Sequence, residues 1–388
     1  MVEFKEAFER IALEAKDPNL KPPFNNLDVF NKIREVSKNR ELILYGCGVG
    51  GSAVAAILNH FGIPFHGVCD STRTGVFPYT GQNIISPAIL CEKHKDAIVL
   101  ISSGDYEDEI ANTLKELGFK DEQVLPFPPP PIFPPALTPV EIFANKHYDG
   151  YEWAYGLLSD DLSRSVLLGV VRMHLLGCEI KRSSKSPQYF EEGVIRLKEN
   201  EVFVDGGSFI GDSVVMLFKE CKKVGVNYKK VYSFEADPQS CIKVRNELLY
   251  YPNVEVVPKG LWSSETDLVF TRTTLSASSS LASSRAGEKF TVPVTSLDVF
   301  FADKAQEDWP TFIKMDIEGA EVEALKGSKE VITAKRPKLA LCTYHALEHP
   351  YELLRLSHEY CPSYRFFLRQ CTDGYYEQVL YAVEGDIK

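Results

Sequence analysis

The chain has 388 residues, a length that predicts two domains. Of these residues 44% are hydrophobic and 25% are charged, a composition typical of a folded globular protein. Its net charge of −11 and the lack of a long basic run argue against a nucleic-acid partner, because phosphate backbones are bound by clustered lysine and arginine. The apolar stretches are too short for a membrane span, and the charged N-terminus is unlike a secretory signal. The nine cysteines include no Cys-x-x-Cys pair, so we expect reduced thiols and a cytoplasmic protein.

The order of apolar runs, helical patterns and prolines divides the chain into four predicted segments. Strand-like and helix-like stretches alternate after about residue 40 and again after Glu201, which predicts two α/β domains with parallel sheets. Between them lies "PFPPPPIFPPALTP", in which each proline lacks a donor and prevents a regular helix or central strand. The predicted segments are an N-terminal helical segment (1–39), a small Rossmann-like domain (40–126), a Pro-rich linker and helical bridge (127–187), and a larger Rossmann-like domain (188–388).

A glycine-rich turn marks the smaller domain. The strand "ELILYG" leads into "GCGVGG", a helical stretch follows, and the next strand ends at Asp70. Gly46, Gly48 and Gly51 have the GxGxxG spacing that lets a backbone approach a dinucleotide, and Asp70 stands where a ribose would be held. The sequence therefore predicts a second nucleotide site, for NAD or a nucleotide-activated sugar. The alternative is a domain with a purely structural role.

The larger domain begins its sheet at Glu201. Its predicted parallel strands are "EVFVDGG", "KVYSFEAD", "VEVVPKG", "TFIKMDIEG" and "KLALCTYH". Two later strands, "SYRFFLRQ" and "YEQVLYAV", are separated by a short turn, so we expect an antiparallel hairpin at the end of a mostly parallel sheet. Ligands bind at the carboxyl ends of the strands in such sheets, so the residues that end these strands are the candidates for chemistry.

The first two of these strands end in residues suited to a nucleoside. Asp205, Gly207 and Gly211 follow the first strand, where glycines allow the backbone to come close to a ligand. Glu235 ends the second strand, and its carboxylate can accept hydrogen bonds from both hydroxyls of a ribose. No Gly-Lys-Ser/Thr loop for a triphosphate is present, and acidic residues favour a cationic ligand such as a sulfonium. A tight turn without a ligand is the alternative.

The fourth and fifth strands end in groups that can accept a proton or bind a cation. Asp316 and Glu318 are two positions apart and can share a face, and His345 follows the next strand. Histidine titrates near neutral pH, so His345 could take a proton from a hydroxyl as it attacks a methyl group. The alternatives are that the acids cap the following helix, that His345 is a packed imidazole, or that the three residues hold a divalent cation, although magnesium disfavours histidine.

Six motifs between about Gln188 and Val383, about half of the chain, resemble the FkbM family of methyltransferases. They are "QYF", "VFVDGGSFIGDS", "SFEADP", "TSLD", "IKMDIEGAE" and "TYH", in the order and spacing of that family. The resemblance implies a Rossmann-like fold that uses S-adenosylmethionine to methylate a hydroxyl, often on a sugar or a secondary metabolite. It implies that Asp316 lies between cofactor and acceptor. The cofactor residues expected within these motifs are Asp205, Gly206, Gly207, Gly211, Glu235, Asp237 and Asp316.

The sequence departs from the family directly after His345. Ala346 and Leu347 stand where family members with this tail carry a lysine or arginine and a proline, a difference that concerns acceptor contacts more than cofactor binding. We expect an S-adenosylmethionine-dependent O-methyltransferase with His345 and Asp316 as catalytic residues and no required metal. The set for an optional divalent cation is Asp316, Glu318 and His345.

Two other classes of function are kept as alternatives. The first is an NAD-dependent oxidoreductase or nucleotide-sugar-binding protein that works through the smaller domain. The second is a scaffold that keeps the fold without turnover. The expected partners are a small-molecule or glycan acceptor and, if the protein is a homo-oligomer, a second copy of the chain.

Overall fold

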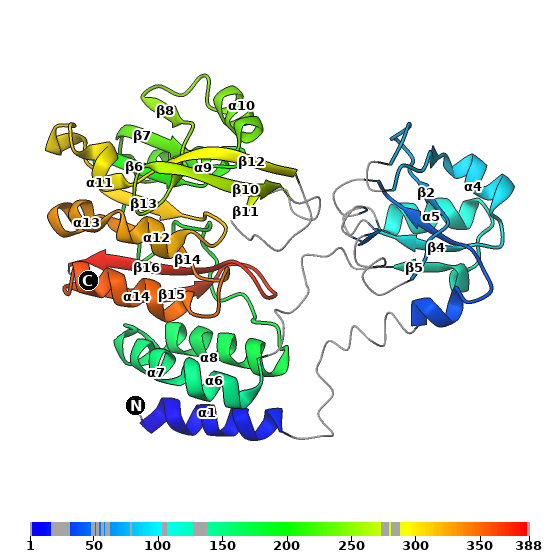
Figure 1. Ribbon diagram of the computed structural model, residues 1–388, viewed down its shortest axis with the longest axis horizontal. Coiled ribbons are helices and arrows are strands. Elements are labelled where there is room, and N and C mark those ends of the chain that lie inside the picture. Colours follow the sequence, from blue (N-terminus) through cyan, green and yellow to red (C-terminus); the bar gives the residue numbers. More distant parts are fainter. Residues whose placement is uncertain are drawn as a thin grey trace. The chain divides into compact units, whose positions relative to one another are not determined.

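In the computed structural model, the described residues form two compact units, each with its own sheet (Figure 1). The smaller unit lies within 32–126, and the larger unit contains the rest. No helix among the described residues is long and apolar enough to cross a membrane. The structure describes residues 2–16, 32–47, 51, 54–55, 58, 63–77, 80–102, 107–126, 138–272, 279–280 and 288–385.

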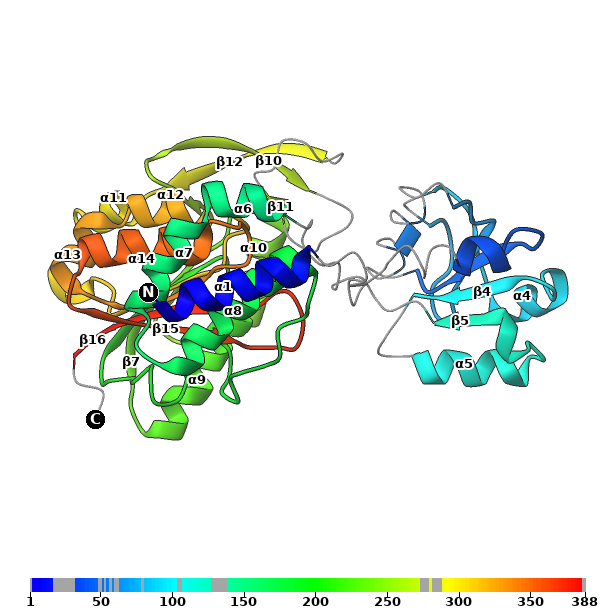
Figure 2. The same ribbon diagram turned by 90° about the horizontal axis from the view of Figure 1, so that it is seen from below.

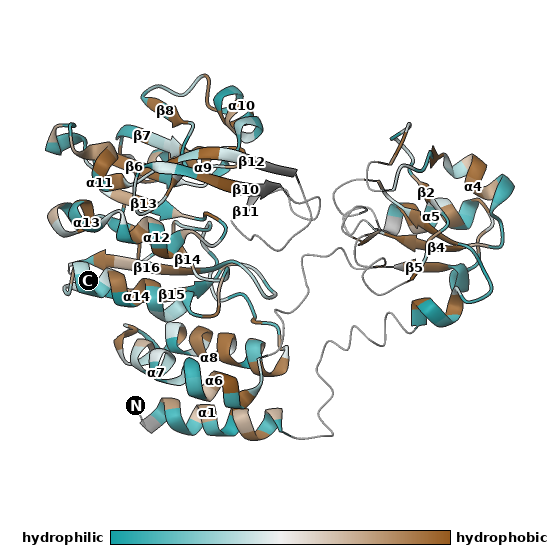
Figure 3. Ribbon diagram, in the orientation of Figure 1, coloured by the Kyte–Doolittle hydropathy of each residue, from teal (hydrophilic) through white to brown (hydrophobic). Residues whose placement is uncertain are grey.

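The smaller unit is a parallel five-stranded sheet in the order β3-β2-β1-β4-β5. Alternate residues of β1 join separate apolar clusters: Leu42 and Leu44 belong to one, and Ile43 and Tyr45 belong to the other. Burial on both faces explains the continuous apolar strands, which are largely brown in Figure 3. The elements are β1 (Leu42–Tyr45), β2 (Gly67–Cys69), β3 (Ile84–Ile85), α4 (Pro87–Lys93), β4 (Ile98–Ile101), α5 (Glu107–Glu116), η1 (Asp121–Gln123) and β5 (Val124–Pro126).

The main sheet of the larger unit has seven strands in the order β15-β16-β14-β13-β6-β7-β8. Its pairs are parallel except β14–β16 and β15–β16, so the predicted antiparallel hairpin at the end of a mostly parallel sheet is confirmed. The strands are β6 (Glu201–Gly206), β7 (Tyr228–Phe234), β8 (Val254–Val257), β13 (Phe312–Met315), β14 (Lys338–Cys342), β15 (Tyr364–Gln370) and β16 (Gln378–Glu384).

Helices cover both faces of this sheet, as in other α/β proteins (Figures 1 and 2). On one face, α9 and α10 bury Val214, Leu217 and Val244 in a cluster with Phe203 and Phe312 of the central strands. The helices α11 to α14 lie together on the other face. These helices and one short turn are α9 (Asp212–Val224), α10 (Pro238–Glu247), α11 (Leu297–Phe301), η2 (Gln306–Asp308), α12 (Glu321–Lys326), α13 (Lys329–Lys335) and α14 (His349–Tyr360).

A second, small sheet in the larger unit has no counterpart among the predicted strands. It has the order β11-β10-β12-β9, and Val292 and Val294 of β12 form a small core with Leu268 of β10. Its strands flank a serine-rich stretch, and serine gives little signal for a strand. The strands are β9 (Gly260–Leu261), β10 (Thr266–Arg272), β11 (Ser279–Ser280) and β12 (Glu288–Thr295).

Four helices outside the main sheet also belong to the larger unit. The rings of Phe4 and Phe8 in the first helix pack against Tyr148, at centroid distances of 5.5 and 5.0 Å. Arg369 of β15 forms an ion pair of 2.7 Å with Asp160, which precedes the last of these helices. The predicted helical bridge is therefore part of the larger unit, and residues 127–137 of the predicted linker lie outside the described residues. The helices are α1 (Val2–Ala15), α6 (Val140–Lys146), α7 (Tyr148–Leu157) and α8 (Asp161–Leu176).

Candidate active site

The turn after β6 lies directly against the end of β13. Gly207 has φ +78°, and a Cβ atom there would stand 1.9 Å from the carbonyl oxygen of Asp316. Its amide donates to the carbonyl of Phe234 at the end of β7, over 3.0 Å. Gly211, with φ +87°, caps α9. The glycines are therefore required for the chain itself to pack, and this packing brings the carboxyl ends of β6, β7 and β13 together.

A buried ion pair fixes this turn. Lys314 Nζ lies 3.0 Å from Asp205 Oδ1, and both side chains are almost fully buried. The same ammonium donates to the carbonyls of Gly206 and Gly207, over 3.2 and 2.8 Å. Burial acts to lower the pKa of Lys314, but the charges of Asp205 and Asp316, with further effects of Cys342 and of the hydrogen bond to Asp205, together raise it, so the amine stays charged.

Asp205 was predicted to bind the cofactor, but one of its carboxylate oxygens is paired with Lys314. Its other oxygen accepts a hydrogen bond from Ser213 Oγ over 2.8 Å, so the carboxylate is engaged inside the protein. Asp205 thus holds Lys314 and the start of α9, and its contribution to the site is through the position of the turn. Sequence reasoning missed Lys314, although a lone lysine inside the apolar strand "FIKM" is a signal for a buried partner.

Glu235 lies at the end of β7 with its carboxylate held in place. Its two oxygens accept hydrogen bonds from the amides of Phe209 and Asp237, over 2.7 and 2.8 Å. Burial raises the pKa of Glu235 above its ordinary value, against the effect of these two amides. Among the described residues these two amides are its hydrogen-bond donors, which leaves about two of the four acceptor positions of a carboxylate for a ligand.

The free acceptor positions of Glu235 fit the ribose hydroxyls of S-adenosylmethionine. A fixed carboxylate with free acceptor positions, next to a glycine turn at the carboxyl edge of a parallel sheet, is the arrangement that binds ribose hydroxyls. Asp237 was predicted to bind the cofactor as well. In the structure its carboxylate caps α10 by accepting a hydrogen bond from the amide of Gln239 over 3.2 Å.

Asp316 follows β13 and is held by two tyrosine hydroxyls. Tyr189 donates to one oxygen over 2.8 Å, and Tyr344 donates to the other over 3.0 Å. Burial acts to raise the pKa of Asp316, but the positive charges of Lys314 and His345 and the two tyrosine hydroxyls together lower it. The side chain is 22% exposed, so an ionised carboxylate at this edge can be reached by a ligand.

His345 stands beside Asp316 and is oriented from behind by Glu321. Its Nδ1 lies 2.8 Å from Glu321 Oε1, while its Nε2 lies 3.6 Å from Asp316 and 3.8 Å from Glu318. Burial acts to lower the pKa of His345, but Glu321, followed by Asp316 and Glu318, raises it to about 9. The predicted pair of Asp316 and His345 is therefore brought together. Glu321, which is fully buried, was not among the predicted site residues.

Backbone strain is concentrated around these groups. Among the described residues, seven other than glycine have φ in the left-handed region, which an L side chain adopts at a cost. Two of the seven are asparagines, which tolerate it, and one is Arg336 at a helix end. The other four contact the site, and strained residues of this kind cluster at functional sites. They are Tyr189, Phe209, Glu318 and Glu377.

Further polar and aromatic groups extend this edge of the sheet. The ring of Tyr376 packs edge-on against Tyr344, with centroids 5.9 Å apart. The amide of Gln188 donates to the carboxylate of Glu377. Burial, followed by the charge of Asp316, raises the pKa of Glu377. Rings and hydrogen-bonding side chains therefore lie close to Asp316 at this edge of the sheet.

The residues predicted for an optional cation do not form the group that best fits one. His345 lies 3.6 and 3.8 Å from Asp316 and Glu318, as given above. In the part of the chain that the structure describes, the three residues whose ligand atoms all lie within 4.8 Å of one another are Glu321, His345 and His349.

In the smaller unit, the residues of the predicted second nucleotide site are held by their own loop. Asp70 ends β2, and its carboxylate accepts hydrogen bonds from the amides of Cys47, Thr72 and Arg73 and from the Thr72 hydroxyl. Gly46 has φ +116°, and a Cβ on Gly51 would lie 2.0 Å from the carbonyl oxygen of Gly46. The third glycine, Gly48, lies outside the described residues.

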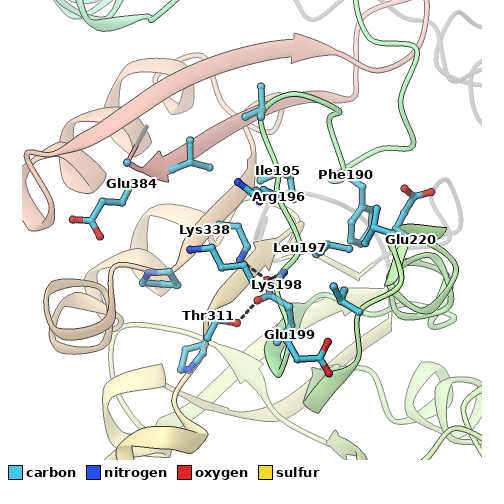
Figure 4. A pocket seen from close by; sticks show the side chains of 18 of the residues that line it. Phe190, Ile195, Arg196, Leu197, Lys198, Glu199, Glu220, Thr311, Lys338 and Glu384 are labelled. Atoms are coloured by element: carbon cyan, nitrogen blue, oxygen red, sulfur yellow. Dashed lines mark hydrogen bonds and ion pairs between the residues drawn. The ribbon is translucent and has the colours of Figure 1, made fainter. Parts of the chain in front are cut away.

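A pocket of about 1000 Å³ lies at the opposite end of the main sheet (Figure 4). It is lined by residues at the starts of the strands, including Glu201 and Lys338, whose side chains form an ion pair of 2.6 Å. Thr311 donates to the same carboxylate. Since the groups described above lie at the carboxyl ends of the strands, this pocket is separate from the candidate active site.

Comparison with known families agrees with this geometry. Residues 205–374 match the family model of the methyltransferase FkbM domain. The matched range contains Glu235, Asp316 and His345. This part of the chain is an FkbM methyltransferase domain. The protein is therefore an S-adenosylmethionine-dependent methyltransferase, as predicted, with S-adenosylmethionine as the methyl donor.

One of the similar solved structures shares the fold over nearly the whole chain. A crystal structure of an FkbM methyltransferase from Methylobacillus flagellatus is 23% identical, with a TM-score of 0.58, and the match covers 98% of this chain and 99% of that chain. A precorrin-6y C5,15-methyltransferase from Geobacter metallireducens is 10% identical with a TM-score of 0.30, over 52% of this chain and 94% of that chain. A SAM-dependent methyltransferase from Aquifex aeolicus is 18% identical with a TM-score of 0.28, over 48% and 84%. No match was found among curated proteins.

Proposed function

We propose that the FkbM domain methylates a hydroxyl group of a sugar or another carbohydrate-like acceptor, which includes a sugar carried by a secondary metabolite. The observation that supports this proposal most directly is the set of side chains around Asp316. Tyrosine rings and uncharged or acidic hydrogen-bonding groups meet there beside the glycine turn. Such a mixture suits a ligand with apolar C–H faces and many hydroxyls.

The cofactor side of the site is assigned to the ends of β6 and β7. Glu235 would accept hydrogen bonds from the ribose hydroxyls, and the backbone of Gly206, Gly207 and Gly211 would form the adjacent turn. S-adenosylmethionine, when bound, supplies an electrophilic methyl group on a sulfonium. The nearby carboxylates suit this positive charge.

The acceptor side is assigned to the ends of β13 and β14. The carboxylates of Asp316, Glu318 and Glu377 outnumber the one imidazolium, His345, on this side, which disfavours phosphates and other anionic acceptors. Tyr344 and Tyr376 offer ring faces and edges, and Gln188 and Glu377 offer hydrogen-bonding groups. A neutral, polyhydroxylated acceptor matches these groups best.

Asp316 is the group that we assign to the reacting hydroxyl. Its two oxygens have about four acceptor positions, and the two tyrosine hydroxyls occupy two of them. It can therefore accept a hydrogen bond from the acceptor hydroxyl and then the proton as the methyl group is transferred. His345 borders the same space and helps to orient the hydroxyl. Positioning of the two reactants supplies much of the expected acceleration.

The test is a methyl-transfer assay with neutral sugars, sugar phosphates and phenols as acceptors. We expect transfer to a neutral sugar, and a kcat that falls about 100-fold or more in Asp316→Asn because the proton acceptor is lost. Asp308→Asn is the matched control, since Asp308 precedes β13 whereas Asp316 follows it. Methylation of anionic acceptors alone, or full turnover by Asp316→Asn, would contradict the proposal.

A second function, binding of NAD or a nucleotide-activated sugar by the smaller unit, has one observation in its favour. The sheet order β3-β2-β1-β4-β5 places the turn after β1 at the point where the strand order reverses, and nucleotides bind at such points. Titration with NAD tests this function separately. We also propose a cytoplasmic location, which all nine cysteines support because they are free thiols.

A further inference from the structure

Three residues near the candidate active site form a cluster that methyl transfer does not explain. Glu321 begins α12, His345 follows β14, and His349 begins α14. Their ligand atoms lie within 4.8 Å of one another, and Glu321 and His349 are buried. We infer that these residues form a binding site for a divalent transition-metal ion, with zinc as the best fit.

The distance between His349 and Glu321 is that of two ligands of one metal. His349 Nδ1 lies 3.5 Å from Glu321 Oε2. This separation exceeds the usual length of a hydrogen bond, about 2.7–3.2 Å. Two ligands that each lie about 2.1 Å from a tetrahedral zinc ion are about 3.4 Å apart. The separation of this pair is therefore that of two zinc ligands.

His349 Nδ1 is also buried without a hydrogen-bond partner among the described residues. The side chain is 4% exposed, so water reaches the nitrogen poorly. A buried polar atom left without a partner is destabilising, and native proteins rarely keep one without a reason. A metal ion bound to this nitrogen supplies the missing partner.

The carboxylate of Glu321 is already held in a fixed orientation. The amides of Ile317 and Gly319 donate to its two oxygens, over 2.8 and 3.1 Å. Oε1 also contacts Nδ1 of His345, whereas Oε2, which faces His349, keeps a second lone pair that can bind a metal. Metal-binding carboxylates are often oriented by hydrogen bonds of this kind.

The surroundings of His345 complete the arrangement. Its Nδ1 lies 2.8 Å from Glu321 Oε1, a hydrogen-bond distance, so an ion bound to both groups would replace this hydrogen bond and move the two atoms apart by a few tenths of an ångström. Its Nε2 faces the carboxylates of Asp316 and Glu318 at 3.6 and 3.8 Å. A histidine that binds a metal through one ring nitrogen usually directs the other toward a carboxylate. Two imidazoles and one carboxylate favour zinc or a similar transition metal over magnesium or calcium, which prefer oxygen ligands.

The experiment is a metal titration of the full chain after treatment with a chelator. Zinc and magnesium are added separately, binding is measured by calorimetry, and the bound metal is counted by mass spectrometry after dialysis. We expect one zinc ion per chain at this site and no magnesium. In His349→Gln, zinc binding should weaken by about 100-fold or more, because one ligand is lost.

Matched controls separate this site from other zinc-binding groups, including the free cysteines. His358→Gln removes another histidine of α14, which is half-buried, lies outside the cluster and likewise has a buried Nδ1 without a hydrogen-bond partner, and this variant should bind zinc as the unmodified protein does. The unfolding midpoint of each variant without metal shows whether it folds. The inference is overturned if the unmodified protein binds no zinc, or if folded His349→Gln binds zinc equally well. Neither result depends on methyl transfer or on the acceptor.

Discussion

The two units contain the same local arrangement, a strand, a glycine turn and an acidic residue at the end of the next strand. In the smaller unit Asp70 accepts a hydrogen bond from the amide of Cys47 in the turn, and in the larger unit Glu235 accepts one from the amide of Phe209. The two carboxylates differ in how many further hydrogen bonds they accept. Asp70 accepts three further hydrogen bonds from Thr72 and Arg73, whereas Glu235 accepts one, from Asp237.

This difference shows that the sequence pattern alone does not identify a nucleotide site. The loop after β2 gives three hydrogen bonds to Oδ1 of Asp70 and one to Oδ2, so about one acceptor position stays open, on Oδ2. Glu235 keeps about one open position on each of its two oxygens, as a pair of ribose hydroxyls requires. Among the described residues, a buried lysine fixes the glycine turn in the larger unit alone. The comparison therefore favours the turn after β6 as the cofactor site, and three substitutions test it.

The largest effect is expected for Gly207→Ala. Its Cβ would lie 1.9 Å from a backbone oxygen that cannot move aside, so we expect a loss of roughly 3 kcal/mol or more in stability and no measurable binding of S-adenosylhomocysteine. Gly46→Ala is the matched change in the smaller unit. There the Cβ would meet the side-chain oxygen of Ser102 at 2.6 Å, and binding should persist. Chemical denaturation and calorimetry measure both effects.

Equal binding by Gly207→Ala and the unmodified protein would show that the turn after β6 tolerates a side chain. In that case the turn would not set the geometry of the cofactor site.

The next effect concerns the buried lysine. Lys314→Met leaves Asp205 buried without its ion pair, so we expect a loss of about 3–5 kcal/mol in the free energy of unfolding. Lys338→Met breaks the other buried pair of β6, with Glu201 at the opposite end of the strand. Both variants should be destabilised, but only Lys314→Met should also weaken S-adenosylhomocysteine binding in the folded protein. Weakening by both variants alike would mean that general stability, not the turn, governs binding.

The smallest effect is expected for Asp70→Ala. The loop after β2 loses the acceptor of four hydrogen bonds, so its amides should exchange with solvent faster, with a local loss of about 1–3 kcal/mol. Hydrogen exchange measures this change directly. Unchanged exchange at Cys47, Thr72 and Arg73 would contradict the capping role of Asp70.

Much of the fold follows from local pattern. Strand and helix alternation predicted both sheets and the final hairpin, because buried parallel strands and a short turn leave strong signals. The small sheet of β9 to β12 was missed, since its strands are short or flank a serine-rich stretch. Strand ends likewise predicted that Glu235, Asp316 and His345 lie along one edge.

The partners of these residues could not be read from sequence. Tyr189 is 127 positions from Asp316, and His349 meets Glu321 only because α12 and α14 pack together. Such contacts depend on tertiary packing and have no fixed spacing. Asp205 and Asp237 illustrate the same limit, because both stand in cofactor motifs, yet in the structure they bind Lys314 and the amide of Gln239.

The most direct test of the central claim is calorimetric titration of S-adenosylhomocysteine into the unmodified protein, Glu235→Ala and Asp70→Ala. We predict binding by the unmodified protein, a loss of about 100-fold in affinity for Glu235→Ala because two charge-assisted hydrogen bonds are removed, and no change for Asp70→Ala. Unchanged affinity in Glu235→Ala, or a loss confined to Asp70→Ala, would contradict the assignment of the cofactor site to the turn after β6.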